Sequence, residues 1–157
     1  MTAARKEQFM KILATGFGAG LSPVAPGTAG TLVGVLICLP WLCYPLPCVF
    51  RLLFVVAISA VSIYVAGQAE ILYGKTDDQR IVIDEIAGLQ VAMLPVAITG
   101  LHLCIAFVLF RIFDIWKPFP LDHCQKFPGG WGVVADDLGA GVYAGLILLL
   151  LTWTGVL

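Results

Sequence analysis

Two pairs of adjacent carboxylates stand out in this chain, because each borders a long apolar segment. Asp84-Glu85 lies near the start of one such segment, and Asp136-Asp137 directly precedes the apolar tail 138–157. Adjacent carboxylates repel each other and are poorly solvated at a membrane edge, so each pair is costly unless it binds a cation or takes up a proton. The two pairs therefore indicate a site for a polyvalent cation.

A third group of charges is Arg111, Asp114 and Lys117, whose spacing of three residues would stack them on one face of a helix. Together with the two pairs, this group brings five carboxylates and two cations, a balance of −3. Such a balance at a poorly hydrated edge requires bound cations or raised pKa values. Carboxylate ligands of this kind suit Mg²⁺ first, with Mn²⁺ or Ca²⁺ as alternatives.

The segment SPVAPGT, which begins at Ser22, is a candidate phosphate-binding element. Its prolines and glycine predict an irregular turn leading into a helix that Thr28 or Thr31 caps. The N-terminus of such a helix offers backbone N–H groups to an anion. Ser22, Thr28 and Thr31 could add hydroxyl groups, and Arg111 and Lys117 could neutralise phosphate oxygens. With a bound cation, these parts favour metal-assisted phosphoryl hydrolysis.

The composition indicates an integral membrane protein. Of the 157 residues, 60% are hydrophobic and 12% are charged, whereas soluble domains carry about 25% charged residues. The net charge of −1 argues against nucleic acid as a partner. We expect a single all-α membrane domain over residues 1–157.

The apolar runs predict a helical bundle of about four to five spans. The expected spans cover, approximately, residues 28–45, 52–69, 81–95, 101–113 and 133–157. Segment 9–21 is too short to cross a bilayer, so we expect a short N-terminal amphipathic or re-entrant segment there. Prolines interrupt the first run, and a four-span bundle with a re-entrant first segment stays open.

The basic residues predict the orientation. Five spans place the N-terminus, the loop 73–80 and the stretch 111–126 on one side of the membrane. Eight basic residues lie on that side: Arg5, Lys6, Lys11, Lys75, Arg80, Arg111, Lys117 and Lys126. Only Arg51 lies on the other, which predicts a cytoplasmic N-terminus. The candidate site residues then gather at the cytoplasmic membrane edge.

Each feature also has a purely structural interpretation. The acidic pairs could be solvated helix N-termini, where the helix dipole favours acids, and residues 111–117 could form an ion-pair ladder. A small cation or proton transporter is a rival class of function, and it predicts acids spread across the membrane depth. A phosphatase for another lipid phosphate, such as phosphatidic acid, stays open as well, because nothing in these residues identifies a headgroup.

Four sequence blocks resemble those of the phosphatidylglycerophosphatase A family in order and spacing: GFGAGLSPVAPGTAGT (16–31), IVIDEIAG (81–88), FRIFDIWKPFP (110–120) and GGWGVVADDLGAG (129–141). The resemblance extends from about residue 9 into the C-terminal span. It implies a Mg²⁺-dependent, multi-pass phosphatase of the bacterial inner membrane. Such an enzyme would hydrolyse phosphatidylglycerophosphate to phosphatidylglycerol and phosphate at the cytoplasmic face.

The resemblance also implies which positions carry the chemistry. By the matching blocks, the expected catalytic residues are Asp84, Glu85, Asp114, Asp136 and Asp137. The expected metal ligands are Asp84, Glu85, Asp136 and Asp137. Adjacent residues of a helix point about 100° apart, so one member of each pair could hold the metal while the other orients a neighbouring group. Which acid is ligand, base or nucleophile stays open, as do the number of metal ions and the oligomeric state.

Overall fold

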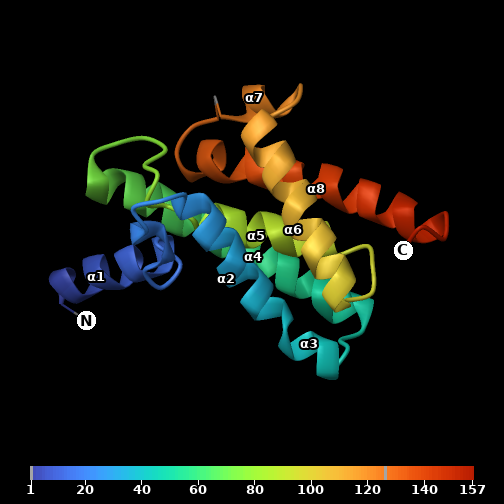
Figure 1. The fold of residues 1–157 in the computed structure, drawn as a ribbon. Coiled ribbons are helices and arrows are strands. Elements are labelled where there is room, and N and C mark those ends of the chain that lie inside the picture. Colours follow the sequence, from blue (N-terminus) through green and yellow to red (C-terminus); the bar gives the residue numbers. More distant parts are fainter. Residues whose placement is uncertain (1, 126) are drawn as a thin grey trace.

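The computed structural model describes residues 2–125 and 127–157, and the regular elements of these residues are all helical (Figure 1). In chain order they are α1 (Ala3–Ala14), the 3-10 helix η1 (Ala19–Leu21), α2 (Pro26–Cys38), α3 (Pro40–Cys43), α4 (Cys48–Tyr73), α5 (Ile83–Met93), α6 (Gly100–Trp116), α7 (Leu121–Cys124) and α8 (Gly130–Trp153). The all-α prediction is confirmed for the described residues. Lys126, one of the basic residues used to predict orientation, lies outside them.

Three segments of the described chain are long and apolar enough to cross a membrane: Pro26–Cys43, Cys48–Tyr73 and Gly130–Trp153. The first combines α2 and α3. Helix α6 has 17 residues and α5 only 11, shorter than the roughly 20 residues that a perpendicular span needs. They take the places of the expected fourth and third spans. The predicted helical membrane bundle is therefore confirmed, with three long helices packed around two shorter ones.

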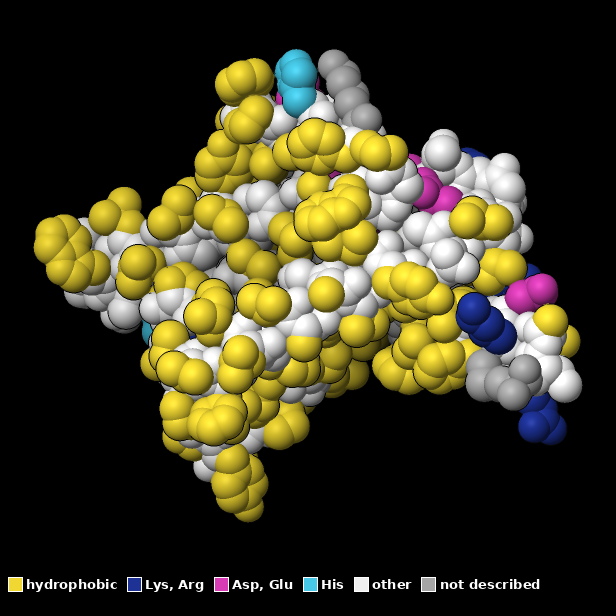
Figure 2. All heavy atoms as spheres, turned by 180° about the vertical axis from the view of Figure 1, so that it is seen from behind, with side chains coloured by type: hydrophobic (Ala, Val, Ile, Leu, Met, Phe, Trp, Pro, Cys, Tyr) yellow, Lys and Arg dark blue, Asp and Glu magenta, His cyan; other side chains and the backbone are white. Residues whose placement is uncertain are grey.

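The outer surface of the bundle is mostly apolar, as a bilayer requires. Figure 2 shows apolar side chains over most of one face, whereas the Lys and Arg side chains visible there gather at the end of the molecule where α1 lies. Long helices α4 and α8 carry exposed Leu, Ile, Val, Phe and Trp side chains along their lengths. This surface would be costly in water and is favourable against lipid.

The short helix α5 is the centre of the bundle. It contacts α2, α4, α6 and α8, and Figure 1 shows it in the middle of the fold. Nine of its eleven residues are buried, and Leu89 and Met93 belong to the same core cluster as Phe110 and Leu148. Its two charged residues both lie in its first turn. The first turn of α5 is therefore the part of this buried helix that can contribute to a polar site.

Helices α5 and α8 approach each other through glycine. A Cβ atom built on Gly141 would lie 2.3 Å from the backbone oxygen of Gly88, and one built on Gly88 would lie 2.7 Å from the backbone oxygen of Asp137. Only residues without a side chain allow two helix backbones to come this close. This contact places the acidic part of α8 directly beside the first turn of α5.

Arg51 anchors the opposite end of α5. The sequence predicted a second span that begins at about residue 52, just after Arg51; α4 begins at Cys48 instead and includes Arg51. Its guanidinium group donates hydrogen bonds to the backbone oxygens of Met93 and, at 3.0 Å, Leu94. The last carbonyl groups of a helix lack intrahelical partners and carry its negative dipole end, so the half-buried Arg51 is stabilised there.

The predicted N-terminal segment 9–21 is not a single element: it contains the end of α1, which begins at Ala3 and ends at Ala14, and the 3-10 helix η1. Helix α1 packs against α4 at one end of the bundle, and the backbone N–H of Val82 donates to the oxygen of Ala14 at 2.9 Å.

The predicted capping of α2 by Thr28 or Thr31 is wrong. The helix begins at Pro26, whose fixed φ suits a first helical position, so both threonines lie inside it.

Candidate active site

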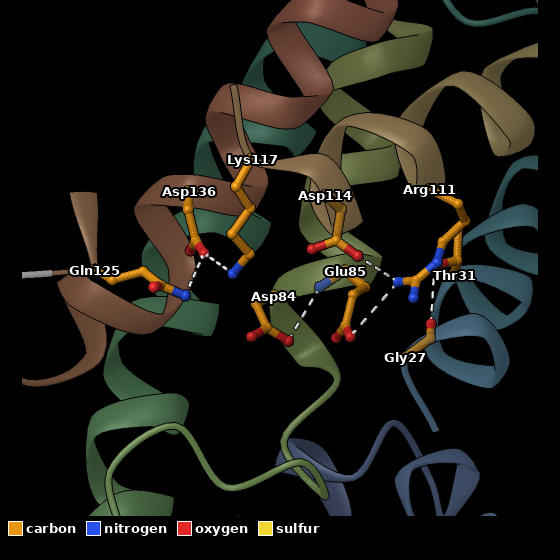
Figure 3. A network of polar contacts seen from close by, with 9 residues as sticks. All are labelled: Gly27, Thr31, Asp84, Glu85, Arg111, Asp114, Lys117, Gln125 and Asp136. Carbon is orange, nitrogen blue, oxygen red and sulfur yellow. Dashed lines mark hydrogen bonds and ion pairs between the residues drawn. The ribbon is translucent and has the colours of Figure 1, made fainter. Parts of the chain in front are cut away.

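The ends of four helices converge on one polar pocket of about 300 Å³. These are the N-termini of α2 and α5, the C-terminus of α6 and the second turn of α8. Figure 3 shows the charged side chains of α5, α6 and α8 gathered beside the N-terminus of α2. The charged residues that line the pocket are Asp77, Asp84, Glu85, Arg111, Asp114, Lys117, Asp136 and Asp137. The features that the sequence placed at one membrane edge therefore lie together, although their chemical roles stay predictions.

The acidic pairs are buried and not solvated. Asp84, Asp136 and Asp137 are 6%, 3% and 4% exposed. In addition, Asp136 and Asp137 lie in the second turn of α8, beyond the first turn to which the favourable effect of the helix dipole is confined. Asp84 and Glu85 do lie in the first turn of α5, as the structural interpretation expected, but Asp84 is buried; for Asp136 and Asp137 the interpretation as a solvated helix N-terminus is wrong.

Three carboxylates form a candidate cation site. One oxygen from each of Asp84, Glu85 and Asp137 lies within 4.8 Å of the other two. Oε2 of Glu85 is buried and has no hydrogen-bond partner among the described residues. Three facing carboxylates repel one another, and an unsatisfied buried oxygen is costly, so a cation bound between these oxygens would stabilise the cluster. The donor set fits a hard divalent cation.

Arg111 stands beside this cluster. Its Nη1 is 2.5 Å from Oδ2 of Asp114 and 3.8 Å from Oε1 of Glu85. The pair with Asp114 has the predicted three-residue spacing on α6. Nε of Arg111 is buried without a partner in the described part of the chain. Arg111 lines the pocket, so its guanidinium group is suited to receive an anionic oxygen there.

Lys117 was predicted to stack with Arg111 and Asp114 on one face of a helix, and it does not. It follows the last residue of α6 and has φ +46°, so its side chain leaves the helical face and instead donates a hydrogen bond to Oδ2 of Asp136. Gln125 donates to the same oxygen at 3.2 Å. Burial is the largest single influence on the pKa of Lys117 and lowers it, but the hydrogen bond to Asp136 and the charges of Asp136, Asp137 and Asp114 together outweigh burial, so the pKa lies above its ordinary value. The amine is therefore charged at neutral pH.

The two neighbouring acids of α8 thus have different environments. Asp137 faces Asp84 and Glu85, whereas Asp136 is bonded to Lys117 and Gln125 through one oxygen. Its other oxygen, Oδ1, is buried without a partner among the described residues. Asp136, one of the four predicted metal ligands, is consequently not part of the three-carboxylate cluster.

The N-terminus of α2 closes the pocket with its backbone. Ala25, Pro26 and Gly27 line this side. A Cβ atom on Gly27 would lie 2.3 Å from Oε1 of Glu85 and 3.0 Å from Nη1 of Arg111. Glycine at this position is therefore what allows these two charged groups to rest against α2.

The three hydroxyl residues predicted to bind phosphate are not among the described residues that line the pocket. Ser22 donates a hydrogen bond to the oxygen of Val24 at 2.8 Å, and Thr31 donates one to the oxygen of Gly27 at 2.9 Å. Thr31 is fully buried, and Thr28 lies in the first turn of α2. The predicted turn does reach the site, but it presents backbone in place of these hydroxyls.

The sequence did not single out three polar residues at or beside the pocket. Asp77 and Gln79 line it, and Gln125 bonds to Asp136. Asp77 has φ +48°, and its backbone N–H donates to Oε1 of Glu70 at 2.9 Å. The loop from which Asp77 and Gln79 come shows only an ordinary mixture of charges in the sequence, so no local pattern could have identified them.

Comparison with known proteins is in line with the resemblance of the four sequence blocks. The model of a family described as phosphatidylglycerophosphatase A matches residues 12–152. Proteins named phosphatidylglycerophosphatase A from Escherichia coli and Haemophilus influenzae are 34% and 33% identical to this chain; each alignment covers 87% of it, and 80% and 85% of those proteins. A Bacteroides thetaiotaomicron protein named "Putative phosphatidylinositol-3-phosphatase" is 37% identical, over 95% of this chain and 98% of that protein. No solved structure matches the chain.

Proposed function

Because this chain belongs to the phosphatidylglycerophosphatase A family, we propose that it hydrolyses phosphatidylglycerophosphate to phosphatidylglycerol and inorganic phosphate. The observation that carries the proposal is the three-carboxylate cluster beside Arg111, at the charged end of a buried helix. A cation site next to a guanidinium group is what a phosphomonoester requires, since its negative charge must be bound and neutralised.

Mg²⁺ is the cation that we propose for the cluster, held by Asp84, Glu85 and Asp137. The fit rests on the three convergent oxygens and on the unsatisfied Oε2 of Glu85. When bound, Mg²⁺ polarises phosphate oxygens and makes a coordinated water more acidic. Asp136 is assigned to a different task, because one of its oxygens already accepts hydrogen bonds from Lys117 and Gln125.

The remaining residues bind and orient the phosphate. Arg111 lines the pocket and offers its guanidinium group to a phosphate oxygen, and Lys117 adds a positive charge that Asp136 holds at the pocket. The N-terminus of α2 lines the same space through Ala25, Pro26 and Gly27, and the N-terminus of a helix stabilises an anion. Asp114 lines the pocket with one oxygen bound to Arg111, and we assign it to accept a proton from the attacking water.

We further propose that the pocket faces the cytoplasm at the inner membrane. The count of basic residues on the two sides supports this orientation. The pocket lies at the ends of the membrane-crossing segments that contain α2 and α8. A lipid headgroup could therefore enter the pocket while its acyl chains remain beside the apolar outer surface of the bundle.

A phosphoinositide is a specific alternative to phosphatidylglycerophosphate as the substrate. The relative from Bacteroides thetaiotaomicron carries a name that specifies a phosphoinositide, and its alignment covers nearly the full length of both chains. Phosphatidylinositol 3-phosphate, like phosphatidic acid, presents a phosphomonoester, and the described pocket binds that group in either case. A transporter gains no support, because the acids of the pocket gather at one end of the helices.

The deciding experiment is phosphate release by the purified protein in detergent micelles. Phosphatidylglycerophosphate, phosphatidic acid and phosphatidylinositol 3-phosphate are each tested with Mg²⁺ and with EDTA. We expect Mg²⁺-dependent release from phosphatidylglycerophosphate alone. Release from the phosphoinositide alone would reassign the substrate, and no release from any lipid by folded protein would refute the phosphatase.

Two variants separate the roles of the neighbouring acids of α8. Asp137→Asn removes a proposed ligand and should abolish turnover at ordinary Mg²⁺ concentrations, with partial recovery at high Mg²⁺. Asp136→Asn should abolish turnover without unfolding the protein and without recovery at high Mg²⁺, because it releases Lys117. Glu7→Gln, on the exposed helix α1, is the control for loss of a carboxylate. Full activity of Asp136→Asn would refute the site.

A further inference from the structure

A second, larger pocket lies at the same end of the bundle, outside the acidic site. It has a volume of about 550 Å³ and is formed by α1, the turn that follows α1, the last residue of α4 and Arg80. The acidic pocket is lined by Gln79 and Ile81, the chain neighbours of Arg80. The loop that contains these residues therefore separates two pockets, and nothing in the proposed reaction uses the second one.

This second pocket is positively charged. Among the described residues that line it, Lys11 and Arg80 are charged and none is acidic. Both cations lie over the ring of Tyr73: Cζ of Arg80 is 3.9 Å and Nζ of Lys11 is 5.8 Å from the ring centroid. Nε and Nη2 of Arg80 also donate to Oδ1 and Oδ2 of Asp78 at 2.7 and 3.0 Å. This pair holds the guanidinium group in place and offsets much of its charge, so the net positive charge of the pocket comes from Lys11. Lys11 has no carboxylate within ion-pair distance in the described part of the chain, so its charge is available to an anion.

The mouth of the same pocket is apolar. Phe17 and Leu21 line it and are 75% and 64% exposed. Phe17 has φ +59° between two glycines that also have positive φ, an unusual backbone for a bulky residue. The turn thus displays an aromatic side chain next to two cations. A free phosphate ion makes no favourable contact with such an apolar surface, whereas the acyl region of a lipid packs against it.

The position of the pocket also suits a lipid. Tyr73 is the last residue of α4, a membrane-crossing helix, so the pocket lies where that helix leaves the apolar layer. The turn is fixed to the bundle by the hydrogen bond from Val82 to Ala14. Figure 2 shows basic side chains and exposed apolar ones side by side at this end of the molecule.

We propose that this pocket binds an anionic phospholipid at a site distinct from the active site. The lipid phosphate lies between Lys11 and Arg80, and the start of the acyl chains rests on Phe17 and Leu21. A basic residue near an anionic lipid surface contributes about a fivefold change in affinity. The inference does not depend on the proposed reaction, because the ligand need not carry a phosphomonoester.

The test is native mass spectrometry of the full-length protein released from detergent, with phosphatidylserine or phosphatidylcholine added. Phosphatidylserine is anionic and is neither substrate nor product of the proposed reaction. We expect the wild-type protein to retain phosphatidylserine in preference to phosphatidylcholine. Lys11→Gln should weaken phosphatidylserine binding about fivefold. The matched control is Lys6→Gln, the same change on an exposed position of α1 that does not line the pocket.

Three outcomes would overturn the proposal. An equal loss of phosphatidylserine affinity in Lys11→Gln and Lys6→Gln would show a general charge effect of α1. Unchanged phosphatidylserine binding by Lys11→Gln would refute the proposed site. Displacement of phosphatidylserine by millimolar inorganic phosphate would reassign the pocket to a soluble anion. Lipid binding is measured without Mg²⁺ and without substrate, so an inactive protein that still binds phosphatidylserine through Lys11 would refute the phosphatase and leave this site intact.

Discussion

The replacement of Gly27 by alanine separates stability from function. Gly27 is the second residue of α2, and its missing side chain leaves room for Glu85 and Arg111. Alanine is favoured over glycine within helices by up to about 1 kcal/mol. Helix propensity alone therefore predicts that the substitution is neutral or slightly stabilising, whereas the geometry of the site predicts a large loss of activity.

The magnitude follows from the distances. The new Cβ atom would lie 2.3 Å from Oε1 of Glu85, and ordinary van der Waals contact begins at 3.4 Å. Glu85 must therefore move by about 1 Å, and Arg111, which would lie 3.0 Å from the Cβ atom, must shift as well. A misplacement of 1 Å among groups that hold substrate costs about 100-fold in rate. We expect kcat/KM to fall about 100-fold, which corresponds to about 2.7 kcal/mol of transition-state stabilisation.

The assay is Mg²⁺-dependent phosphate release, paired with thermal unfolding in the same detergent. The matched control is Gly100→Ala, because Gly100 also begins a helix and a Cβ atom there meets nothing within 4 Å. Gly100→Ala should retain full activity. If Gly27→Ala kept wild-type kcat/KM, the close approach of Glu85 and Arg111 to α2 would not be required for catalysis, and the site geometry argued above would be wrong.

Three other perturbations test the scaffold around the site. Arg51→Leu leaves carbonyl groups at the end of α5 without their donor and should lower the free energy of unfolding by about 1–3 kcal/mol in chemical denaturation; an unchanged value would show that these bonds are dispensable. The hydrogen bond from Arg80 holds the pKa of Asp78 below its ordinary value of 3.8, so the stability that this pair contributes is complete above that value and is lost as the pH falls through the lowered pKa. Thermal unfolding from pH 7 to pH 2 should accordingly show a smaller acid-induced loss for Asp78→Asn than for wild type, and equal losses would contradict the linkage. Gly141→Ala places a Cβ atom 2.3 Å from the backbone oxygen of Gly88, so it should lower both the unfolding temperature and the activity, and a variant with normal values of both would show that α5 and α8 can separate without consequence.

Much of the architecture was accessible from composition and spacing. A chain with 12% charged residues must bury its polar backbone in helices where it meets lipid, and the few charges then mark the helix ends. This reasoning correctly brought Asp84, Glu85, Arg111, Asp114 and both acids of α8 to one place. It erred at Arg51, where the predicted span was made to begin after a single charged residue, because a half-buried cation can lie inside a helix when another helix supplies carbonyl partners.

The sequence by itself determined the class of fold and most of the charged residues of the candidate site, because residue type and hydrophobic spacing suffice for these; Asp77, Gln79 and Gln125 were found only in the tertiary structure. Only the tertiary structure distinguished Asp136 from Asp137. Neighbouring residues of a helix point about 100° apart, and which of them faces α5 depends on the glycine contact between α5 and α8. The same holds for Lys117, which leaves the face of α6 through a positive φ, and for Gly27, whose importance lies in the space that it leaves to Glu85. Contacts between distant segments decide these roles, and no local pattern records them.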